Sequence, residues 1–319
     1  MHLTRFAATA LATVVGVYGL PPEGGSYADG GSYADGGSYA DGGNHAGAQA
    51  PVVIQTVLSA ETGGPGDIVR LEVICNCDAT DSSATVFGRT VHLARIGDRW
   101  QGLIGIDLDV RPGTYPIEIA ITPTGSGVVA PARKLTVIDK KYPVRRLRVA
   151  PVFVDPPASE VARIQQDAAA LQTIFEAAGS PRRWHGAFQP PVSDPPNSSF
   201  GARSIYNGQA RSPHSGTDFS ARAGTPVTAP ASGTVALARP LYFTGNTVVL
   251  DHGLGLYSLL AHLQEIDVKE GDRITRGDVV GLVGGTGRVT APHLHWSVRL
   301  NNARVDPLAL LAVTKDLTH

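Results

Sequence analysis

Apolar and polar residues alternate in short segments along much of the chain, which is the period-2 pattern of half-buried β-strands. In the first half the pattern is clearest over residues 68–73, 114–121 and 134–137, and turn signals rich in Gly and Pro separate these segments. Short strands at such regular intervals predict an accessory β domain over residues 51–149. An immunoglobulin-like β-sandwich is its expected fold.

The same pattern returns after residue 200. Strands are predicted over residues 234–237, 247–250, 256–260, 279–283 and 295–298. Helical spacing does not reappear before residue 307. We therefore predict an antiparallel β domain over residues 200–311, followed by a tail over residues 312–319. The protein as a whole is expected to be mainly β.

One stretch between the two β regions has apolar residues at helical spacing. It predicts a helix over residues 159–178, within a connector that spans residues 150–199. Ser159 is the expected N-cap of this helix, and Gly179 followed by Pro181 is expected to end it. We interpret its apolar stripe as packing against the domain that follows.

The N-terminal residues have the character of an export signal. Residues 6–20 form an almost uncharged apolar run of roughly 15 residues, shorter than the ~20 that a membrane-spanning helix needs. Residues 1–20 are therefore predicted to be a signal peptide. The protein is expected to be exported to the periplasm, cell envelope or extracellular space, with no stable membrane span after signal removal.

A short repeat follows the apolar run. The unit Gly-Gly-Ser-Tyr-Ala-Asp occurs three times within residues 21–50. Because this unit has no aliphatic face to bury, we predict a flexible linker.

Composition narrows the class of protein without identifying it. A length of 319 residues with 42% hydrophobic residues supports two globular units. The formal net charge of −1 gives no general attraction to nucleic acid or to anionic membranes, so nucleic acid is not an expected partner. The two cysteines, Cys75 and Cys77, are interpreted as small half-buried strand residues; a disulfide between them would close a tight, strained ring, and the sequence leaves open whether they are bonded.

Histidine and aspartate gather in short motifs of the last third of the chain. His214 and Asp218 are separated by three residues, and His295 ends a His-x-His pair far downstream. Two neutral nitrogens and one anionic oxygen form a ligand set suited to zinc. Because three protein ligands leave one coordination position open, this set predicts a catalytic zinc rather than a structural one. One Zn²⁺ per chain is the expected cofactor.

Two further histidines are candidates for catalysis. Peptide hydrolysis needs proton transfer and a hydrogen-bond donor to the tetrahedral oxyanion. His293 shares a strand face with His295 if the pair is extended, and His262 lies in a third short motif, so we assign these two roles to His262 and His293. His185 and His252 are interpreted as structural histidines.

The residues around these motifs carry a family resemblance. The matching blocks are SPHSGTDF at 212–219, GTPVTAPASGTV at 224–235, AHL at 261–263, GTG at 285–287 and PHLHW at 292–296. In this order, over residues 200–311, they closely resemble the lysostaphin/LytM-type zinc metalloendopeptidases. The resemblance implies cleavage of stem or cross-bridge peptides in peptidoglycan by a β-sheet domain with a groove. The family pattern implies metal ligands at His214, Asp218 and His295 and catalytic histidines at His262 and His293.

The chain departs from the family pattern at two positions. Leu260 stands where an aromatic residue is common, and Ala291 stands where glycine is common. Both positions bear on groove shape and loop conformation, so they affect the expected substrate preference rather than metal binding. In some relatives upstream segments cover the groove, which makes an autoinhibitory contact from residues before 200 a further hypothesis.

Three other functions compete with a zinc endopeptidase. A catalytically silent peptidoglycan-binding or hydrolase-activating protein on the same scaffold usually lacks one of the five residues, and all five are present here. A biotinyl or lipoyl carrier matches the hairpin rhythm of residues 268–281, but it needs a lysine at a hairpin tip, usually beside Met, and Met1 is the single Met. A D-Ala-D-Ala carboxypeptidase of related geometry needs a Glu close before its last His ligand, where this chain has none. The sequence leaves open which peptide bond of peptidoglycan is cut.

Overall fold

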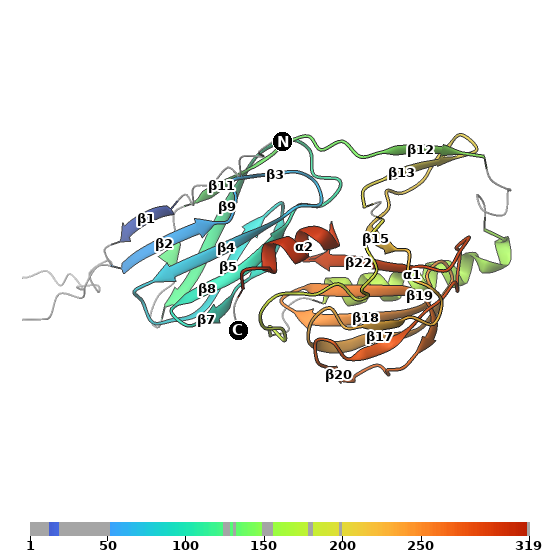
Figure 1. The fold of residues 1–319 in the computed structure, drawn as a ribbon. Helices are drawn as coiled ribbons and strands as arrows, with labels where there is room; N and C mark the ends of the chain where they lie inside the picture. Colours follow the sequence, from blue (N-terminus) through green and yellow to red (C-terminus); the bar gives the residue numbers. More distant parts are fainter. Residues whose placement is uncertain are drawn as a thin grey trace, which may run out of the picture.

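The structure is a computed structural model that describes residues 13–18, 52–123, 128–129, 132–148, 156–177, 181–197 and 200–317. Two β regions lie side by side, and a C-terminal helix lies where they meet (Figure 1). The prediction of a mainly β protein is confirmed. The predicted linker at 21–50 and most of the predicted signal peptide lie outside the described residues. Among the described helices, none is long and apolar enough to cross a membrane.

The N-terminal β region contains two sheets. The first contains, in spatial order, β1 (Thr13–Tyr18), β2 (Val52–Leu58), β4 (Ile68–Cys75), β8 (Arg99–Gly105) and β7 (Ala94–Ile96). The second contains β3 (Thr62–Gly63), β11 (Arg133–Val137), β9 (Gly113–Pro123), β5 (Ala79–Val86) and β6 (Arg89–His92), with β10 (Val128–Val129) beside β9. β1, which falls within the predicted signal peptide, pairs antiparallel with β2.

The two sheets pack against each other as a sandwich. Ile54 and Leu71 of the first sheet and Ile117 and Leu135 of the second are fully buried in one apolar cluster. Along β11, buried and exposed residues alternate strictly, as the period-2 pattern predicts for a strand with one face on the core. An immunoglobulin-like topology for this sandwich stays a prediction.

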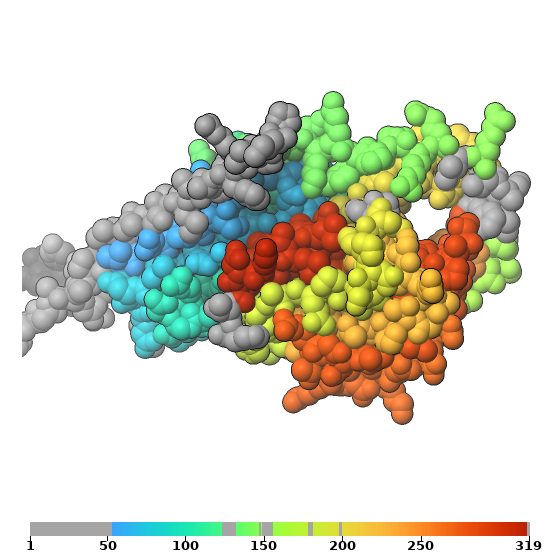
Figure 2. Space-filling view, viewed as in Figure 1, coloured from blue at the N-terminus to red at the C-terminus, as the bar shows by residue number. Residues whose placement is uncertain are grey.

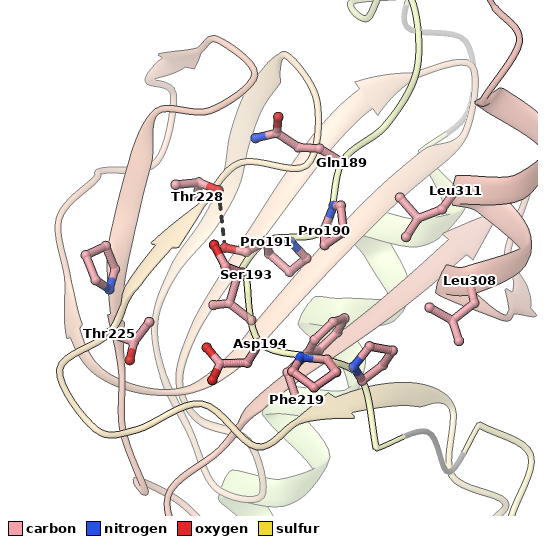
Figure 3. Close-up of a pocket in the computed structure, with 14 residues that line it drawn as sticks. Gln189, Pro190, Pro191, Ser193, Asp194, Phe219, Thr225, Thr228, Leu308 and Leu311 are labelled. Atoms are coloured by element: carbon pink, nitrogen blue, oxygen red, sulfur yellow. Dashed lines mark hydrogen bonds between the residues drawn. The ribbon is translucent and has the colours of Figure 1, made fainter.

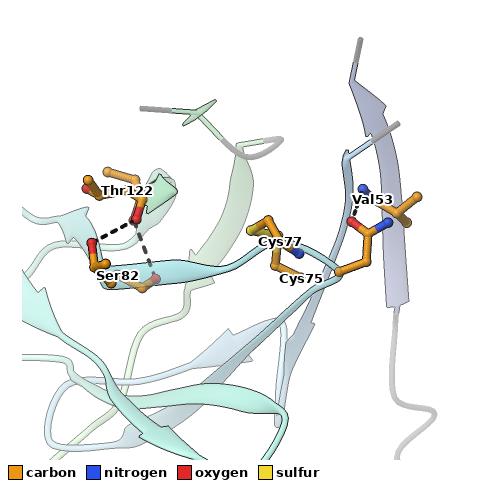
Figure 4. Close-up of a disulfide and its surroundings, with 8 residues drawn as sticks. Val53, Cys75, Cys77, Ser82 and Thr122 are labelled. Carbon is orange, nitrogen blue, oxygen red and sulfur yellow. Dashed lines mark hydrogen bonds between the residues drawn. A yellow bond between two sulfur atoms is a disulfide. The ribbon is translucent and has the colours of Figure 1, made fainter. Parts of the chain in front are cut away.

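Cys75 and Cys77 form a disulfide at the turn between β4 and β5 (Figure 4). The sequence left open whether these two residues are bonded, and the disulfide answers that question. Residues two apart in a straight strand have Cα atoms about 6.6 Å apart. Here the chain bends after β4 and brings the two Cα atoms to 5.1 Å, within the usual range for a disulfide. Asn76, between them, accepts a hydrogen bond of 2.7 Å from the Val53 amide and so ties the turn to β2.

The C-terminal β region is one antiparallel sheet, as predicted. Its strands are, in spatial order, β15 (Gly216–Phe219), β22 (Leu294–Leu300), β19 (Leu256–Ile266), β18 (Gly245–Gly253), β17 (Gly233–Leu241) and β20 (Arg273–Ile274). Three more strands are attached to this order: β21 (Val279–Val283) beside β19, β16 (Pro226–Thr228) beside β21, and β23 (Ala303–Val305) beside β22.

Helix α1 (Val161–Glu176) covers part of this sheet. Phe175 is buried against Tyr257 of β19, with their ring centroids 5.6 Å apart, and Leu171 packs on the same cluster. The predicted helix is therefore present and packs on the following β region. Its predicted N-cap is wrong: a short 3₁₀ turn, η2 (Ala158–Glu160), places Ser159 inside a turn, and the helix begins after Glu160.

A small separate sheet lies along one side of the C-terminal region (Figure 1). It consists of β12 (Val144–Leu147), β13 (Arg203–Tyr206) and β14 (Gln209–Ala210). β12 comes from the end of the N-terminal region and pairs in parallel with β13. The segment that connects the two regions is therefore part of a sheet next to the start of the C-terminal region.

The two β regions share a core. Ile68 and Leu103 of the N-terminal sandwich belong to the same buried apolar cluster as the C-terminal sheet. Arg304 of β23 forms ion pairs with Asp107 and Asp109, both at 2.6 Å. The N-terminal sandwich is thus packed firmly against the C-terminal sheet.

Helix α2 (Pro307–Thr314) fills the junction between the regions. The Asp306 carboxylate accepts a hydrogen bond of 2.9 Å from the Leu308 amide and caps the helix. Thr314, at its end, is fully buried, and its hydroxyl accepts a hydrogen bond of 3.2 Å from the Phe188 amide. The fold thus continues past residue 311, where we expected a tail to begin.

Candidate metal centre

Two neighbouring strands bring together residues that are far apart in the sequence. β15 pairs antiparallel with β22 so that Asp218 lies directly opposite His295. Directly opposed residues of an antiparallel pair point to the same face and lie close together. His214 precedes β15 in a loop, where its amide donates to the Ala202 carbonyl at 2.9 Å and its carbonyl accepts from the Gly201 amide at 2.7 Å. This backbone pairing ties the loop to the segment that leads into β13.

The three predicted ligands converge at one point. Nδ1 of His295 lies 2.9 Å from Oδ1 of Asp218 and 3.0 Å from Nε2 of His214, and the His214 and Asp218 atoms are 3.3 Å apart. In a tetrahedral zinc site with bonds of 2.0–2.1 Å, ligand atoms lie about 3.3 Å from one another. The residues present therefore fit a metal ion, and they are the one group of this kind among the described residues.

The protonation of the group also suits a cation. Burial opposes ionisation of Asp218, but the hydrogen bonds with His214 and His295 outweigh it and hold the pKa of its carboxyl well below the usual range. Burial lowers the pKa of His295, which favours the neutral imidazole. A carboxylate and neutral imidazoles are the forms in which these side chains bind metals.

Gly216 allows the close approach of His295. A Cβ atom at residue 216 would lie 2.6 Å from Cε1 and Nε2 of the His295 ring. Any larger side chain would push the ring away from Asp218. The sequence analysis did not assign this glycine a role, although it lies between the two ligands of the first motif.

His262 stands beside the group in a strained backbone conformation. Its φ is +64°, a left-handed value that is uncommon for a residue other than glycine. Its amide donates to the Thr244 carbonyl at 2.8 Å, and its Nδ1 atom lies 3.0 Å from the Thr286 carbonyl oxygen. A carbonyl oxygen only accepts hydrogen bonds, so Nδ1 carries the proton and Nε2 is the unprotonated nitrogen. The His262 ring lies 5.9 Å from the His295 ring, measured between centroids.

His293 is held in a similar way. Its Nδ1 atom lies 2.9 Å from the Ala291 carbonyl oxygen, and its Nε2 atom lies 3.8 Å from Oδ1 of Asp218. Its ring is 4.9 Å from that of His262. All five residues predicted from the sequence thus lie in one cluster.

Two other histidines lie apart from this cluster. His252 is fully buried, with its ring nitrogens 2.9 Å from the Ser232 carbonyl oxygen and 2.9 Å from the Ser258 hydroxyl. It links β18 to the Ser232 carbonyl before β17 and to Ser258 of β19, which agrees with a structural role. His185 is exposed on the surface next to buried Trp184.

A separate pocket of about 680 Å³ lies on the outer side of β15 (Figure 3). The proline-rich segment at 190–196 forms one wall, and Leu308 and Leu311 of α2 form another. Pro196 pairs with Phe219, the residue after Asp218, and the Asn197 amide donates to the Asp218 carbonyl at 3.0 Å. None of the five clustered residues lines this pocket, so it is separate from the candidate metal centre.

A family model described as Peptidase family M23 matches residues 212–307. Among curated proteins, the chain is similar to the peptidoglycan DD-endopeptidase ShyA of Vibrio cholerae, with 39% identity over 113 residues, or 35% of this chain and 26% of ShyA. It is also similar to the DD-carboxypeptidase/endopeptidase Mpg of Neisseria meningitidis, with 40% identity over 105 residues, or 33% of this chain and 24% of Mpg. The chain therefore spans about a quarter of the length of these curated relatives.

A solved structure extends the similarity beyond this region. A Pseudomonas aeruginosa protein assigned to peptidase M23 shares 32% identity with the chain, with a TM-score of 0.60. The alignment covers 77% of this chain and 94% of that one, so it includes residues outside 212–307.

Proposed function

Because this chain belongs to peptidase family M23, we propose that it is a zinc-dependent endopeptidase that cleaves stem or cross-bridge peptides of peptidoglycan. The observation that carries the proposal is the convergence of one carboxylate oxygen and two imidazole nitrogens of His214, Asp218 and His295. The relative from Vibrio cholerae is named a peptidoglycan DD-endopeptidase, which supports peptidoglycan as the substrate.

We assign the zinc to His214, Asp218 and His295. Zinc held by three protein ligands supplies Lewis acidity and activates water at neutral pH. The cluster is reachable from solvent through two of its members, because 28% of the His214 side-chain surface and 22% of that of Asp218 are exposed. A substrate carbonyl can therefore approach the side of the cluster where His214 and Asp218 are exposed.

His262 is our candidate for the general base. Burial, followed by the neighbouring His295, lowers the pKa of His262 to about 4, so its imidazole is neutral at pH 7. The Thr286 carbonyl holds the proton on Nδ1. Nε2 is then free to accept a proton from the attacking water.

His293 is our candidate for the proton donor and oxyanion stabiliser. It is more exposed than His262, and its Nε2 atom points to the side of the cluster where Asp218 lies. From there a protonated His293 can donate a hydrogen bond to the oxyanion that forms on the substrate, or a proton to the departing amine.

The products released from peptidoglycan distinguish an endopeptidase from two alternative functions. A catalytically silent scaffold protein would release nothing, and the presence of all five residues speaks against it. A carboxypeptidase activity is suggested by the double name of the Neisseria meningitidis relative. It would release a single terminal residue, whereas an endopeptidase would separate cross-linked or bridged fragments.

The experiment is mass spectrometry of soluble fragments released from purified peptidoglycan by the full chain, with and without a chelator. The full chain is used because the two β regions share a core. His262→Ala should retain zinc and lose turnover, and His185→Ala, which changes an exposed histidine outside the cluster, should behave as the wild type. Fragments that appear despite the chelator, or that His262→Ala releases at the wild-type rate, would contradict the proposal.

We also propose that the protein acts outside the cytoplasmic membrane, because peptidoglycan lies there. The predicted signal peptide at 1–20 is the expected route, to the periplasm, cell envelope or extracellular space. Autoinhibition by an upstream segment stays a hypothesis. The Asn197 amide contacts the main chain of Asp218, but the carboxylate of Asp218 keeps 22% of its side-chain surface exposed.

A further inference from the structure

We propose that the exposed arginines of β12 and the residue after it, Arg145, Arg146 and Arg148, bind free carboxylates on the peptide arms of the substrate, beside the metal centre. This inference rests on the proposed function and extends it to substrate recognition. Residues 140–148 read KKYPVRRLR and contain five of the chain's 27 Lys and Arg residues. In a chain with net charge −1, such a concentration of one charge within nine consecutive residues needs a reason.

The arginine strand lies next to the segment that leads into the first ligand. β12 pairs in parallel with β13, with Val144 opposite Arg203, which is another exposed cation. From β13 the chain turns back on itself: the Arg211 amide donates to the Ser204 carbonyl at 2.8 Å, and the His214 amide donates to the Ala202 carbonyl at 2.9 Å. In Figure 2, the green β12 segment stands away from the body of the molecule, above an opening. The strand that carries the arginines is thus joined, through β13, to the segment that leads into the His214 loop.

The three arginines have no acidic partner in an ion pair among the described residues. Lys140, at the start of the run, forms an ion pair of 2.5 Å with Asp67. Among the described residues, Arg145, Arg146 and Arg148 form no salt bridge, and all three are exposed. Neighbouring like charges repel one another, so an anion from outside would relieve this repulsion as well as bind.

The strand that carries these arginines is held in place by its own anchors. The Tyr142 hydroxyl donates to the Pro65 carbonyl, and its ring meets that of Phe200 edge-on at 6.0 Å. The Arg203 amide donates to the Pro143 carbonyl at 2.8 Å. Because the backbone is fixed at this end, the arginines are presented from a defined place, and their planar guanidinium groups are suited to grip carboxylates with two hydrogen bonds.

Phosphate groups of other wall polymers would offer similar chemistry. The position of the strand favours carboxylates, because β12 is joined through β13 to the His214 loop. A ligand at this place belongs to the polymer that is being cut, and the peptides of peptidoglycan carry free carboxylates. We therefore propose that the ligands of the three arginines are the peptide carboxylates of the substrate.

The test is sedimentation with insoluble peptidoglycan from which phosphate polymers have been removed. The protein is the full chain with Arg145→Gln, Arg146→Gln and Arg148→Gln together, compared with the unchanged arginines. Both proteins carry His262→Ala, so that binding is read without cleavage and stays interpretable if cleavage of peptidoglycan is not observed. A matched control replaces three exposed cations of the sandwich, with Arg95→Gln, Arg111→Gln and Lys134→Gln.

The arginine variant should bind about tenfold more weakly at low salt, whereas the control should bind as before. The difference should disappear on peptidoglycan whose carboxylates have been converted to amides, and thermal unfolding should be unchanged because the substituted residues are exposed. Equal binding of the arginine variant and the unchanged protein would overturn the proposal. So would a loss of binding that appears only on walls that retain their phosphate polymers.

Discussion

The Nδ1 atom of His262 lies 3.0 Å from the carbonyl oxygen of Thr286. The Thr286 side chain is itself bonded on both sides: its hydroxyl donates to the Leu263 carbonyl at 2.8 Å and accepts from the Asn246 amide at 2.9 Å. One threonine therefore ties its loop to β18 and β19 and sets the tautomer of His262. We regard Thr286 as a positioning residue, since it acts through His262.

Thr286→Val should slow catalysis without releasing the metal. Valine keeps the shape of threonine but loses both hydrogen bonds of the hydroxyl, so the carbonyl that holds His262 is free to shift. Loss of such an outer hydrogen-bonding partner typically costs 10–100-fold, and we expect about tenfold to a hundredfold in kcat. Thr286→Ser restores the hydroxyl and should recover most of the activity. Measurement of kcat, KM and bound zinc separates this outcome from a loss of substrate binding, which would raise KM instead.

Gly245→Ala should destabilise the protein and disturb the same loop. Gly245 has a φ of +61°, and a Cβ atom there would collide with the main chain of Thr286 and Gly287. We expect a loss of about 2–4 kcal/mol in the free energy of unfolding. Gly271→Ala is the control, because Gly271 has a φ of +92° but nothing within 4 Å of the added carbon, so it should cost only about 1 kcal/mol. Denaturant titration of both variants checks this, and equal losses would show that the collision is relieved.

The strands were predictable wherever the period-2 pattern was unbroken. The segment at 295–298 falls within β22, and the segment at 279–283 matches β21. β19, in contrast, continues to Ile266, well past the predicted end at residue 260. Its pairing with β21 shifts register between Leu263 and Glu265, and the left-handed backbone of His262 further disturbs the alternation. Local patterns do not encode such irregularities.

The types of residue in the site were visible in the sequence, but their geometry was not. The alternation of a strand suggested that His293 and His295 share a face. The contact between Asp218 and His295 depends on the register of β15 and β22, which joins residues 77 apart in the chain. The role of Gly216 arises only after this pairing forms, and that of Thr286 only after its loop packs against β18 and β19. The arginine strand was likewise unassigned, since its neighbour β13 follows more than fifty residues later.

Stability should fall in acid through the pair of Asp107 and Arg304. Burial opposes ionisation of Asp107, but hydrogen bonds from Arg304 outweigh it and lower the pKa of this carboxyl to about 2. Because the folded-state pKa lies below the unfolded value of about 3.8, the contribution is complete above pH 4 and is lost as the pH falls towards 2. The shift corresponds to about 2 kcal/mol.

Asp107→Asn should remove this dependence. Its unfolding free energy should be lower than that of the wild type at pH 6, and the two proteins should approach each other in stability between pH 4 and pH 2. Chemical denaturation at several pH values measures both curves. Parallel curves over that range would show that Asp107 does not titrate with folding. Asp109→Asn is a suitable control, since 75% of the Asp109 side chain is exposed and its pair with Arg304 should contribute little.

Asp218→Asn should weaken metal binding strongly, because it changes one of the three proposed ligands. The amide keeps the size of the carboxylate but removes its charge, and the cluster then offers two neutral imidazoles to a divalent cation. We expect zinc affinity to fall by at least about 100-fold, measured by competition with a chromogenic chelator, and peptidoglycan cleavage to be lost. His252→Gln provides the contrast. It changes a fully buried histidine with two polar partners, so it should lower the free energy of unfolding by about 1–3 kcal/mol and leave zinc affinity unchanged. Wild-type zinc affinity in Asp218→Asn would mean that the metal is held elsewhere, and the assignment of His214 and His295 would fail with it.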